Sequence, residues 1–386
     1  MDFTLSEEHL GAQDLARDFA RREILPRAQE WERTGRFPRD VVRAMGELGF
    51  FGCVIPEEWG GTGAGYLAHV LLVEGISRAH FCLATAFNVQ GASVPRAIVD
   101  WGTPEQKARY VRALVRGEII GCHAITEPNA GSDLAGIQAT ARRDGDAYVL
   151  NGTKMWITYA PVADLALVFA KTNPAERHRG ISAFLVETDT PNLTIHRMDA
   201  VTGSNCLPTG EMAFQDCRVP ADALLGPENG GFRVAVKMLQ STRVTIPARA
   251  VGNAQACLDA AVPYAQQRHA FGVPIGTFQM IKKDIAEMTA HVAAARLLVY
   301  QLAWLMDMGK PCAREASIAK LFASEVGLTV ALRAQFIHGA YGFSKEYPIA
   351  GRLVEAQFLR IAEGTSNIHR LIIADDALGY KKADRE

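Results

Sequence analysis

The chain has 386 residues, of which 48% are hydrophobic, and its formal net charge is −1. This is enough apolar material for a folded protein of two or three domains with a large core. The balanced charge argues against a nucleic-acid binder, and no apolar run approaches the ~18 residues that a membrane-spanning helix requires.

The cysteines and histidines indicate neither disulfides nor a metal site. The seven cysteines are scattered with no CxxC spacing, and the ten histidines show no HxH or HExxH motif. We therefore expect reduced cysteines, mostly in the core, and no bound metal. The N-terminal stretch is charged and helical rather than a secretory signal, which predicts a cytoplasmic protein.

Residues 1–120 show helical periodicity interrupted by Pro and Gly, which predicts an N-terminal helical domain. Ser6 is the expected cap of a helix that ends before Gly35, and Thr103 with Pro104 marks the start of another. Between them, VVRAMGELGF and YLAHVLLVEGISRAH are further predicted helices. The GGTGAG run lacks the spacing of a dinucleotide-binding loop and is expected to be a turn between helices.

Residues 121–228 consist of short apolar runs separated by turn residues, which predicts a small antiparallel β domain of barrel or sandwich type. Within AYVLNGTKMWIT, the Asn151-Gly152 pair predicts a hairpin that joins two strands. The strands predicted to follow are LALVFAKT, GISAFLVET, LTIHRM and GEMAFQDCRVP.

Residues 229–386 return to long helical stretches with short connections, which predicts an antiparallel four-helix bundle. The expected fold class is therefore α+β but mainly α, with a helical domain, a small β domain and a helical bundle in that order. Thr365 or Ser366 is the expected cap of a last amphipathic helix, which Gly379 terminates.

Glu363 is an unusual residue for its position. It stands just before this cap, between the apolar pair Ile361-Ala362 and Gly364. Taken alone, it is best interpreted as a solvated acid near a helix N-terminus, where negative charge is favourable. A catalytic carboxylate is the competing interpretation.

Two further stretches combine residues that suit a ligand. ITEPNAGSDLAG, residues 125–136, mixes small residues with hydroxyls and amides, so its backbone can approach a polar ring edge or a phosphate. In MWITYA, Trp156 and Thr158 are two apart on a predicted strand and are expected to face the same side. A plain surface loop and a half-buried core face are the competing interpretations.

Six motifs occur in one order along the chain, namely ITEPNAGSD, NGTKMWIT, QDCRVP, RHAFG, ASIAKLFASEV and IAEGTSNI. Together they resemble the acyl-CoA dehydrogenase family of flavoenzymes, over essentially the whole chain. The resemblance implies FAD between the β domain and the bundle, reaching into a neighbouring subunit of a homotetramer that is a dimer of dimers.

The resemblance also implies an activity. Such enzymes remove two hydrogens from the α and β carbons of an acyl-CoA thioester, and the flavin N5 accepts the hydride. Electrons then pass to an electron-transfer flavoprotein, as in fatty acid metabolism. The alternatives left open are an acyl-carrier-protein thioester as substrate, an oxygen-using oxidase or hydroxylase, and a binding module that has lost the chemistry.

The glutamate that acts as the α-proton base in the family falls on Glu363. A base for this weakly acidic proton must be close, aligned and poorly stabilised by water. The resemblance also gives the backbone N–H of Glu363 a role in holding the thioester carbonyl. A second family position for the base falls on Thr242, whose hydroxyl cannot do this work, so the role stays with Glu363.

Cofactor and substrate contacts follow from the resemblance position by position. The implied FAD contacts are Thr126, Gly131, Ser132, Trp156, Thr158, Arg268, Phe271, Gln279, Gly339, Thr365 and Asn367. The implied substrate contacts are Ser132, Arg243 and Gly364. Arg268, Phe271 and Gln279 match residues that grip the FAD of the neighbouring subunit, where an arginine can pair with phosphate oxygens through two donors.

One segment departs from the family pattern. The family shows a Gln-x-x-Gly-Gly-x-Gly run where this chain has QFIHGAYG, so the family glutamine falls on Phe336 and Ala340 replaces a glycine. Gly339 remains an expected FAD contact, whereas the roles of Gln335 and Ala340 stay open. His338 is expected to be a packed or capping histidine.

Ala84 bears on the substrate. It occupies the place where glutaryl-specific members of the family carry an arginine for the distal carboxylate. Since an unpaired carboxylate is costly to bury, the sequence favours a monocarboxylic substrate with a short, branched or cyclic acyl group.

Overall fold

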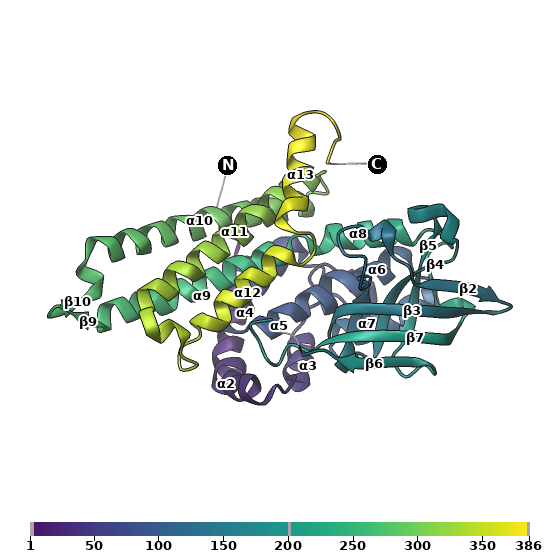
Figure 1. Cartoon of the computed structure of the whole chain (residues 1–386), viewed down its shortest axis with the longest axis horizontal. Helices are drawn as coiled ribbons and strands as arrows, with labels where there is room; N and C mark the ends of the chain where they lie inside the picture. Colours follow the sequence, from purple (N-terminus) through teal and green to yellow (C-terminus); the bar gives the residue numbers. More distant parts are fainter. Residues whose placement is uncertain (1–3, 200–201, 384–386) are drawn as a thin grey trace.

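The computed structural model describes residues 4–199 and 202–383 and has three parts in chain order. Figure 1 shows a β-sheet at one end of the molecule, with the N-terminal helices beside it and the long C-terminal helices extending to the other end. The predicted fold class is confirmed, since helices precede and follow a single β domain.

The N-terminal helices are α1 (Glu7–Phe19), α2 (Leu25–Thr34), α3 (Arg39–Glu47), α4 (Gly65–Ala79), α5 (Phe81–Ala86), α6 (Val94–Trp101) and α7 (Pro104–Val115). Ser6 caps α1 and Thr103 caps α7, as expected. The predicted helix that ends before Gly35 contains a π-helical turn at Ala20–Ile24, just before Pro26. Proline has no N–H to continue the regular helical hydrogen bonds, which accounts for the change of winding.

The β domain is an eight-stranded sheet. Its strands are β1 (Gly121–Ala124), β2 (Thr140–Asp144), β3 (Ala147–Thr158), β4 (Leu165–Lys171), β5 (Ile181–Glu187), β6 (Leu193–Arg197), β7 (Thr209–Pro220) and β8 (Leu224–Leu225). Hydrogen bonds order them β6-β7-β3-β2-β4-β5-β8, with β1 attached to β4. Most pairs are antiparallel, as predicted, but β1 and β2 both pair in parallel with β4.

The Asn151-Gly152 pair does not form the predicted hairpin. Both residues lie inside β3, a strand of 12 residues, and the turn before β3 is made at Gly145, whose φ is +65°. Gly152 has φ +133° and sits at a shift in register between β3 and β7, where an added Cβ would lie 2.8 Å from Ala139. The glycine therefore permits a β-bulge and a close backbone approach rather than a turn.

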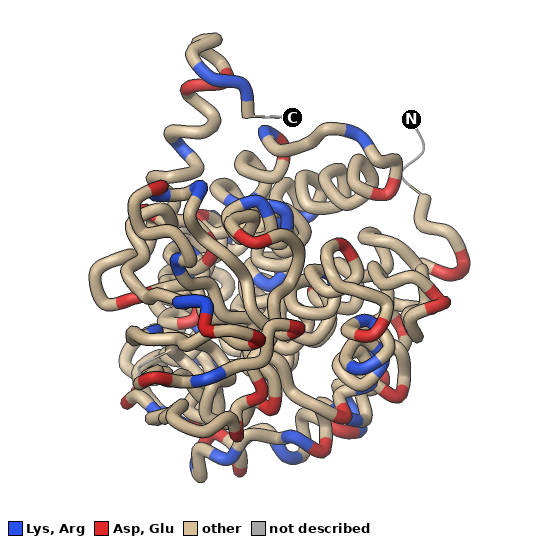
Figure 2. Tube along the Cα trace, turned by 90° about the vertical axis from the view of Figure 1, so that its right-hand side faces the viewer, with Lys and Arg blue, Asp and Glu red and all other residues tan. Residues whose placement is uncertain are grey.

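The C-terminal helices are α8 (Gly231–Thr242), α9 (Thr245–Gln267), α10 (Gln279–Asp307), α11 (Ala313–His338), α12 (Ile349–Ile361) and α13 (Ser366–Ala377). A short hairpin of β9 (His269–Ala270) and β10 (Val273–Pro274) joins α9 to α10. Helices α9 to α12 pack side by side as the predicted bundle, and α13 projects from the body in both Figure 1 and Figure 2.

Charges of both signs lie over the side of the molecule that Figure 2 presents. Figure 2 shows acidic and basic residues interspersed over the face that it presents, in keeping with the net charge of −1. Within the described ranges, no helix is long and apolar enough to cross a membrane.

Candidate active site

Glu363 lies in the turn between α12 and α13, in a backbone conformation that residues other than glycine avoid. Its φ is +54°, and Gly364 follows with φ +102°. Left-handed geometry costs a non-glycine residue about 1–2 kcal/mol and clusters at functional sites. Thr365 then caps α13 by accepting the Ile368 N–H at 3.3 Å, as expected. The turn therefore fixes where the carboxylate stands.

Lys320 holds this turn from the side of α11. Its ammonium donates to the carbonyl of Gly364 at 2.7 Å and to that of Arg360 at 3.2 Å. The side chain is fully buried, and burial lowers the pKa of Lys320 to about 8. The two backbone contacts lock the chain on either side of Glu363.

The Glu363 carboxyl has one occupied and one free oxygen. Asn88 donates its side-chain N–H to Oε1, and Oε2 is buried without a hydrogen-bond partner among the described residues. Burial raises the pKa of Glu363, while the Thr242 hydroxyl and the charge of Arg249 act to lower it. A carboxyl with a raised pKa and a free oxygen is suited to accepting a proton.

The two other polar residues predicted beside Glu363 lie where α8 ends. Thr242, the alternative position for a base, is fully buried and interacts with the Glu363 carboxyl. Arg243 is half-buried, and its Nε is buried without a hydrogen-bond partner in the described chain. Burial lowers the pKa of Arg243, and the charge of Glu363 opposes this shift. The two positions that carry the base in the family, Glu363 and Thr242 in this chain, therefore lie beside each other.

A buried ion pair holds the loop that follows β1 against strand β3. Lys154 is 0% exposed and donates to Glu127 at 2.6 Å and to the carbonyl of Ile125 at 3.1 Å. Glu127 also accepts the backbone N–H groups of Gln138 at 2.5 Å and of Ala139 at 3.0 Å. Burial lowers the pKa of Lys154 to about 8, although Glu127 opposes the shift. The Glu127 carboxylate thus ties the start of the loop to its end at Gln138 and Ala139.

This loop and β3 present an open strip. The Thr126 carbonyl accepts the Met155 N–H at 2.8 Å, which sets the loop alongside the strand. Gly131 and Ser132 are exposed, and no atom lies within 4 Å of a Cβ added at Gly131. Trp156 has φ +62° and is 58% exposed. A flat ligand can therefore approach both the loop backbone and the indole.

Trp156 and Thr158 do not follow regular strand alternation. The register between β3 and β7 shifts between Lys154 and Ile157, so a bulge contains the tryptophan. Thr158 pairs with Thr209 and is half-buried. The expectation that the two side chains share a face assumed a regular strand, whereas a bulge turns its side chain in a new direction.

The remaining FAD residues predicted from the sequence lie elsewhere. Arg268 and Phe271 lie at the β9–β10 hairpin, Gln279 begins α10 and Gly339 follows α11, at the end of the bundle away from β3 (Figure 1). All four are exposed, and Phe271 is 96% exposed. One chain therefore does not bring these residues together with the strip at Trp156. Asn367 is exposed on α13 and binds Arg370 at 2.9 Å.

The QFIHGAYG segment combines packed and exposed residues. His338 is buried, its Nδ1 lies 2.7 Å from the carbonyl of Ala334, and its ring stacks on Tyr264 at 4.2 Å, so it is a packed histidine as expected. Phe336, which takes the place of the family glutamine, is 82% exposed. Gly339 has φ +58° and open space around it.

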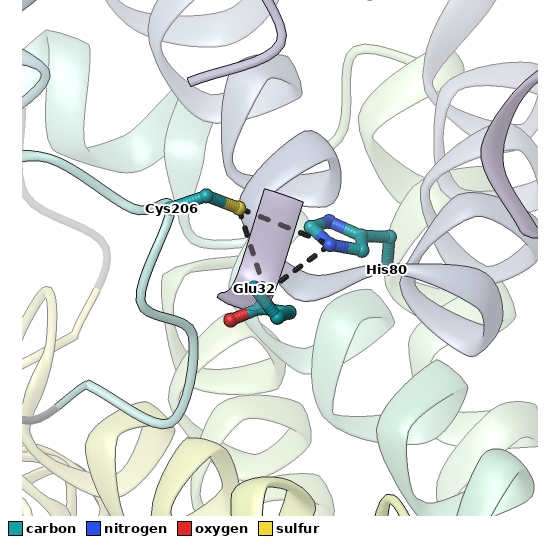
Figure 3. Close-up of side chains that lie close together, drawn as sticks. All are labelled: Glu32, His80 and Cys206. Atoms are coloured by element: carbon teal, nitrogen blue, oxygen red, sulfur yellow. Dashed lines mark hydrogen bonds and ion pairs between the residues drawn. The ribbon is translucent and has the colours of Figure 1, made fainter. Parts of the chain in front are cut away.

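A cluster that the sequence spacing did not indicate joins Glu32, His80 and Cys206 (Figure 3). The imidazole Nε2 lies 3.2 Å from the carboxylate and 3.9 Å from the thiol sulfur, and their ligand atoms lie within 4.8 Å of one another. Burial lowers the pKa of His80, but Cys206 and Glu32 raise it to about 9 overall. A protonated imidazole offers no lone pair to a metal, so we interpret the cluster as ion-paired.

The cluster predicts a specific pH dependence of stability. The raised pKa of His80 gives stability that is complete below about 6.5 and lost as pH rises through about 9. Cys82 and His80 lower the pKa of Cys206 from 9.0 to about 6, so its contribution is lost as pH falls from 9 through 6. In the wild type these two contributions to the pH dependence of stability nearly cancel, because on folding the thiol releases one proton and the imidazole takes up one.

Cys206→Ala should expose the His80 contribution. Because the thiol is one of the groups that raise the His80 pKa, the variant keeps only the part of the shift that Glu32 causes. Relative to the wild type, its free energy of unfolding should fall by up to about 1.4 kcal/mol per pH unit as pH rises from 6.5 through this remaining shift, which ends below pH 9, measured by urea denaturation. Cys122→Ala is the matched control, because burial alone shifts the pKa of that thiol. A difference between Cys206→Ala and wild type that is constant with pH would refute the cluster's charge state.

Three residues of the site were missed by reasoning from sequence. Asn88, Arg249 and Lys320 contact or act on Glu363 or its turn, and each comes from a different distant segment. The one available signal was Arg249, a charged residue within the otherwise weakly polar helical run TIPARAVGNA. Charged residues are almost never fully buried unless they are paired or functional.

Family models match the chain over all three of its parts. The N-terminal domain of acyl-CoA dehydrogenase matches residues 6–118, the middle domain residues 122–217 and the C-terminal domain residues 229–378.

Known proteins are similar over the full length. Glutaryl-CoA dehydrogenase of Desulfococcus multivorans is 41% identical, covering 100% of this chain and 100% of that protein. The mitochondrial short-chain specific acyl-CoA dehydrogenase of Bos taurus is 40% identical, covering 97% of this chain and 91% of that protein. A solved glutaryl-CoA dehydrogenase in complex with glutaryl-CoA has a TM-score of 0.97 at 41% identity, covering 100% and 99% of the two chains.

Two solved neighbours at 30% identity extend the comparison. PigA with FAD and proline has a TM-score of 0.94, covering 98% of this chain and 99% of that one. The prolyl acyl carrier protein oxidase AnaB has a TM-score of 0.92, covering 97% of this chain and 100% of that one.

The open strip fits a flavin. Trp156 is largely exposed to solvent, and Gly131 leaves room for close approach to the backbone. Separately, the turn between α12 and α13 holds the Glu363 Oε2, which is buried without a partner among the described residues. Matches to all three family models and relatives near 40% identity over the full chain show the family. The chain therefore belongs to the acyl-CoA dehydrogenase family of FAD-dependent oxidoreductases.

Proposed function

We propose that this chain removes two hydrogens from the α and β carbons of a short acyl thioester, with Glu363 as the base that takes the α proton. The observation that carries the proposal is the buried Oε2 of Glu363, which lacks a partner among the described residues. Burial also raises the pKa of this carboxyl. An unpaired buried oxygen is costly unless a ligand or a proton uses it, and the α proton of a bound substrate meets that need.

Each side chain then has a defined task. Asn88 holds Oε1 and so leaves Oε2 directed at the proton. Lys320 fixes the turn through the Gly364 carbonyl, which keeps the carboxylate in place during proton transfer. The backbone N–H of Glu363 is assigned to the thioester carbonyl, where it stabilises the negative charge that develops. FAD, when bound, supplies the acceptor for the hydride that leaves the β carbon.

Anaerobic reduction of the flavin by a panel of acyl thioesters tests this function. The oxidised flavin absorbance of the purified holoenzyme should bleach with short acyl-CoA thioesters and remain unchanged with the corresponding free acids. If no thioester bleaches the flavin, the proposed function is wrong. The panel also ranks chain length and branching.

A second candidate is an oxidase that acts on a carrier-protein thioester. The likeness to the prolyl acyl carrier protein oxidase AnaB, at a TM-score of 0.92, is the observation that favours it. We favour the dehydrogenase, with electrons passing to an electron-transfer flavoprotein, because the relatives at 40% and 41% identity are acyl-CoA dehydrogenases. Oxygen consumption that matches substrate turnover would favour the oxidase, whereas turnover that requires the flavoprotein would favour the dehydrogenase.

We also propose that the far end of the bundle grips FAD held by a neighbouring copy, within a homotetramer. Phe271, Phe336 and Phe343 are 96%, 82% and 74% exposed there, which is apolar surface suited to burial against another subunit. Arg268 lies beside them, 5.7 Å from the ring of Tyr341. The guanidinium supplies the positive charge that a pyrophosphate requires.

Arg268→Ala should therefore weaken FAD retention and assembly together. We expect at least about a tenfold rise in the dissociation constant of FAD, since charge-assisted hydrogen bonds contribute roughly 1.5–3 kcal/mol. Flavin content after gel filtration and the mass by light scattering measure both effects. Arg21→Ala, at an exposed arginine in the π-helical turn after α1, is the control and should change neither. Full flavin content in an intact oligomer of Arg268→Ala would exclude the contact.

A further inference from the structure

Arg249 on α9 is a buried cation without a counter-ion. Its side chain is 1% exposed, and its Nη2 donates to the Thr85 hydroxyl at 2.7 Å. The guanidinium lies 4.5 Å from the centroid of the Phe81 ring, and Nε has no hydrogen-bond partner among the described residues. Within those residues, no carboxylate forms an ion pair with it.

The guanidinium stands close to the proposed base. Arg249 is bonded to Thr85 and Glu363 is bonded to Asn88, and these two partners are three residues apart on one continuous helical segment. The segment changes from α-helix to π-helix at Phe87, and residues three apart in it still lie within one turn, no more than ~4.5 Å apart along its axis. Among the charged groups that lower the pKa of Glu363, Arg249 has the largest effect. The cation therefore lies about one helical turn from the base.

Neither nearby carboxylate neutralises Arg249. Glu355 already pairs with Arg352 at 3.3 Å. Glu363 Oε1 accepts a hydrogen bond from Asn88, and its Oε2 has no hydrogen-bond partner in the described part of the chain. The phenol of Tyr159 donates to the carbonyl of Cys82 at 2.6 Å, and burial raises the pKa of that phenol well above its usual value, so it is neutral. A charge buried without a partner is destabilising, which makes this arginine costly to the free protein.

We infer that Arg249 binds the distal carboxylate of a short dicarboxylic acyl monothioester, so that the substrate brings the missing counter-ion. The planar guanidinium retains unpaired donors that match a carboxylate in a two-point contact. Its position one turn from Glu363 restricts the substrate to a short chain between the α carbon and the acid. The inference rests on the proposed dehydrogenation and makes Arg249 a residue that determines specificity.

This revises the expectation drawn from Ala84. That expectation assumed that a cation for a distal carboxylate must come from the helix that carries residue 84. Ala84 lies on α5 and supplies no charge, but the next residue, Thr85, receives the guanidinium of Arg249 from α9. A cation thus reaches the same short helix from a different part of the chain.

The test compares acids with their neutral esters on the holoenzyme. Succinyl-CoA, glutaryl-CoA and the monomethyl ester of each are assayed by anaerobic flavin reduction. For the better acid, kcat/KM should exceed that of its ester by on the order of 10²-fold. Arg249→Met should lower kcat/KM on the acid by on the order of 10²-fold more than on the ester, and the smaller change on the ester reports the loss of the Arg249 charge beside Glu363. Arg249→Lys keeps the charge but loses the two-point geometry and should be intermediate.

The outcomes separate the inference from the proposed function. A wild-type preference for the esters, or equal losses on acid and ester in Arg249→Met, would overturn the role of Arg249. If no thioester reduces the flavin, the dehydrogenase proposal fails, and calorimetric binding of the thioether analogue of glutaryl-CoA, which cannot be dehydrogenated, still tests Arg249. Binding of that analogue should then weaken by on the order of 10²-fold in Arg249→Met, and unchanged binding would refute the inference.

Discussion

Glu363→Gln should retain FAD but lose reduction of the flavin by substrate by about 10²–10⁴-fold, the range that a positioned general base contributes. The amide is nearly isosteric with the carboxyl and can keep the contact with Asn88 that the structure shows. It cannot accept the α proton, so substrate should bind and remain unreacted. Stopped-flow bleaching under anaerobic conditions measures the loss.

Two observations sharpen this prediction. Because burial raises the pKa of Glu363, wild-type activity should rise with pH as this carboxyl ionises, and Glu363→Gln should lack that limb of the profile. Asn88→Ala removes the partner of Oε1 but leaves the carboxylate in place. The rate of flavin reduction should therefore fall much less in Asn88→Ala than in Glu363→Gln. Fast bleaching in Glu363→Gln would assign the base to another residue.

Lys154→Met should destabilise the fold by about 3–5 kcal/mol, because removal of one partner leaves a buried charge unpaired. In the structure Lys154 and Glu127 are 0% and 6% exposed and lie 2.6 Å apart. Without the ammonium, the Glu127 carboxylate keeps only its backbone donors at Gln138 and Ala139. Urea denaturation with far-UV circular dichroism measures the loss.

The matched control for this variant is the double substitution Glu127→Gln/Lys154→Met. Removing both charges takes away the unpaired carboxylate, so the double variant should recover part of the stability lost in Lys154→Met. FAD affinity should fall in both variants, because Glu127 organises the loop that carries Gly131 and Ser132. A double variant less stable than Lys154→Met alone would show that the charge pair is not the cause.

Local rules predicted much of the fold. Helix caps at Ser6, Thr103 and Thr365 are confirmed, since they depend on side-chain oxygens and backbone N–H groups a few residues apart. The prediction at Asn151-Gly152 was wrong, because the same glycine that suits a turn also suits a bulge. Only the position of Ala139, a distant residue, decides between the two.

The candidate site was predicted less completely. Glu363 and the loop with Gly131 were identified because motifs made the family recognisable. Arg249, Asn88 and Lys320 act through contacts between segments more than 40 residues apart, as with Lys320 and Gly364, which are 44 apart. No periodicity in a single sequence reports such long-range pairs. Buried polar partners become visible only when hydrogen bonds are counted in three dimensions.

The distance between the open strip at Trp156 and the hairpin at Arg268 has a genetic consequence (Figure 1). If each cofactor is shared between two copies, a lesion at the hairpin harms the site of the neighbouring copy and leaves the chain's own strip intact. In a mixed population, a chain damaged at one end and a chain damaged at the other would still build some undamaged sites. Two recessive alleles could then compensate for each other in one cell.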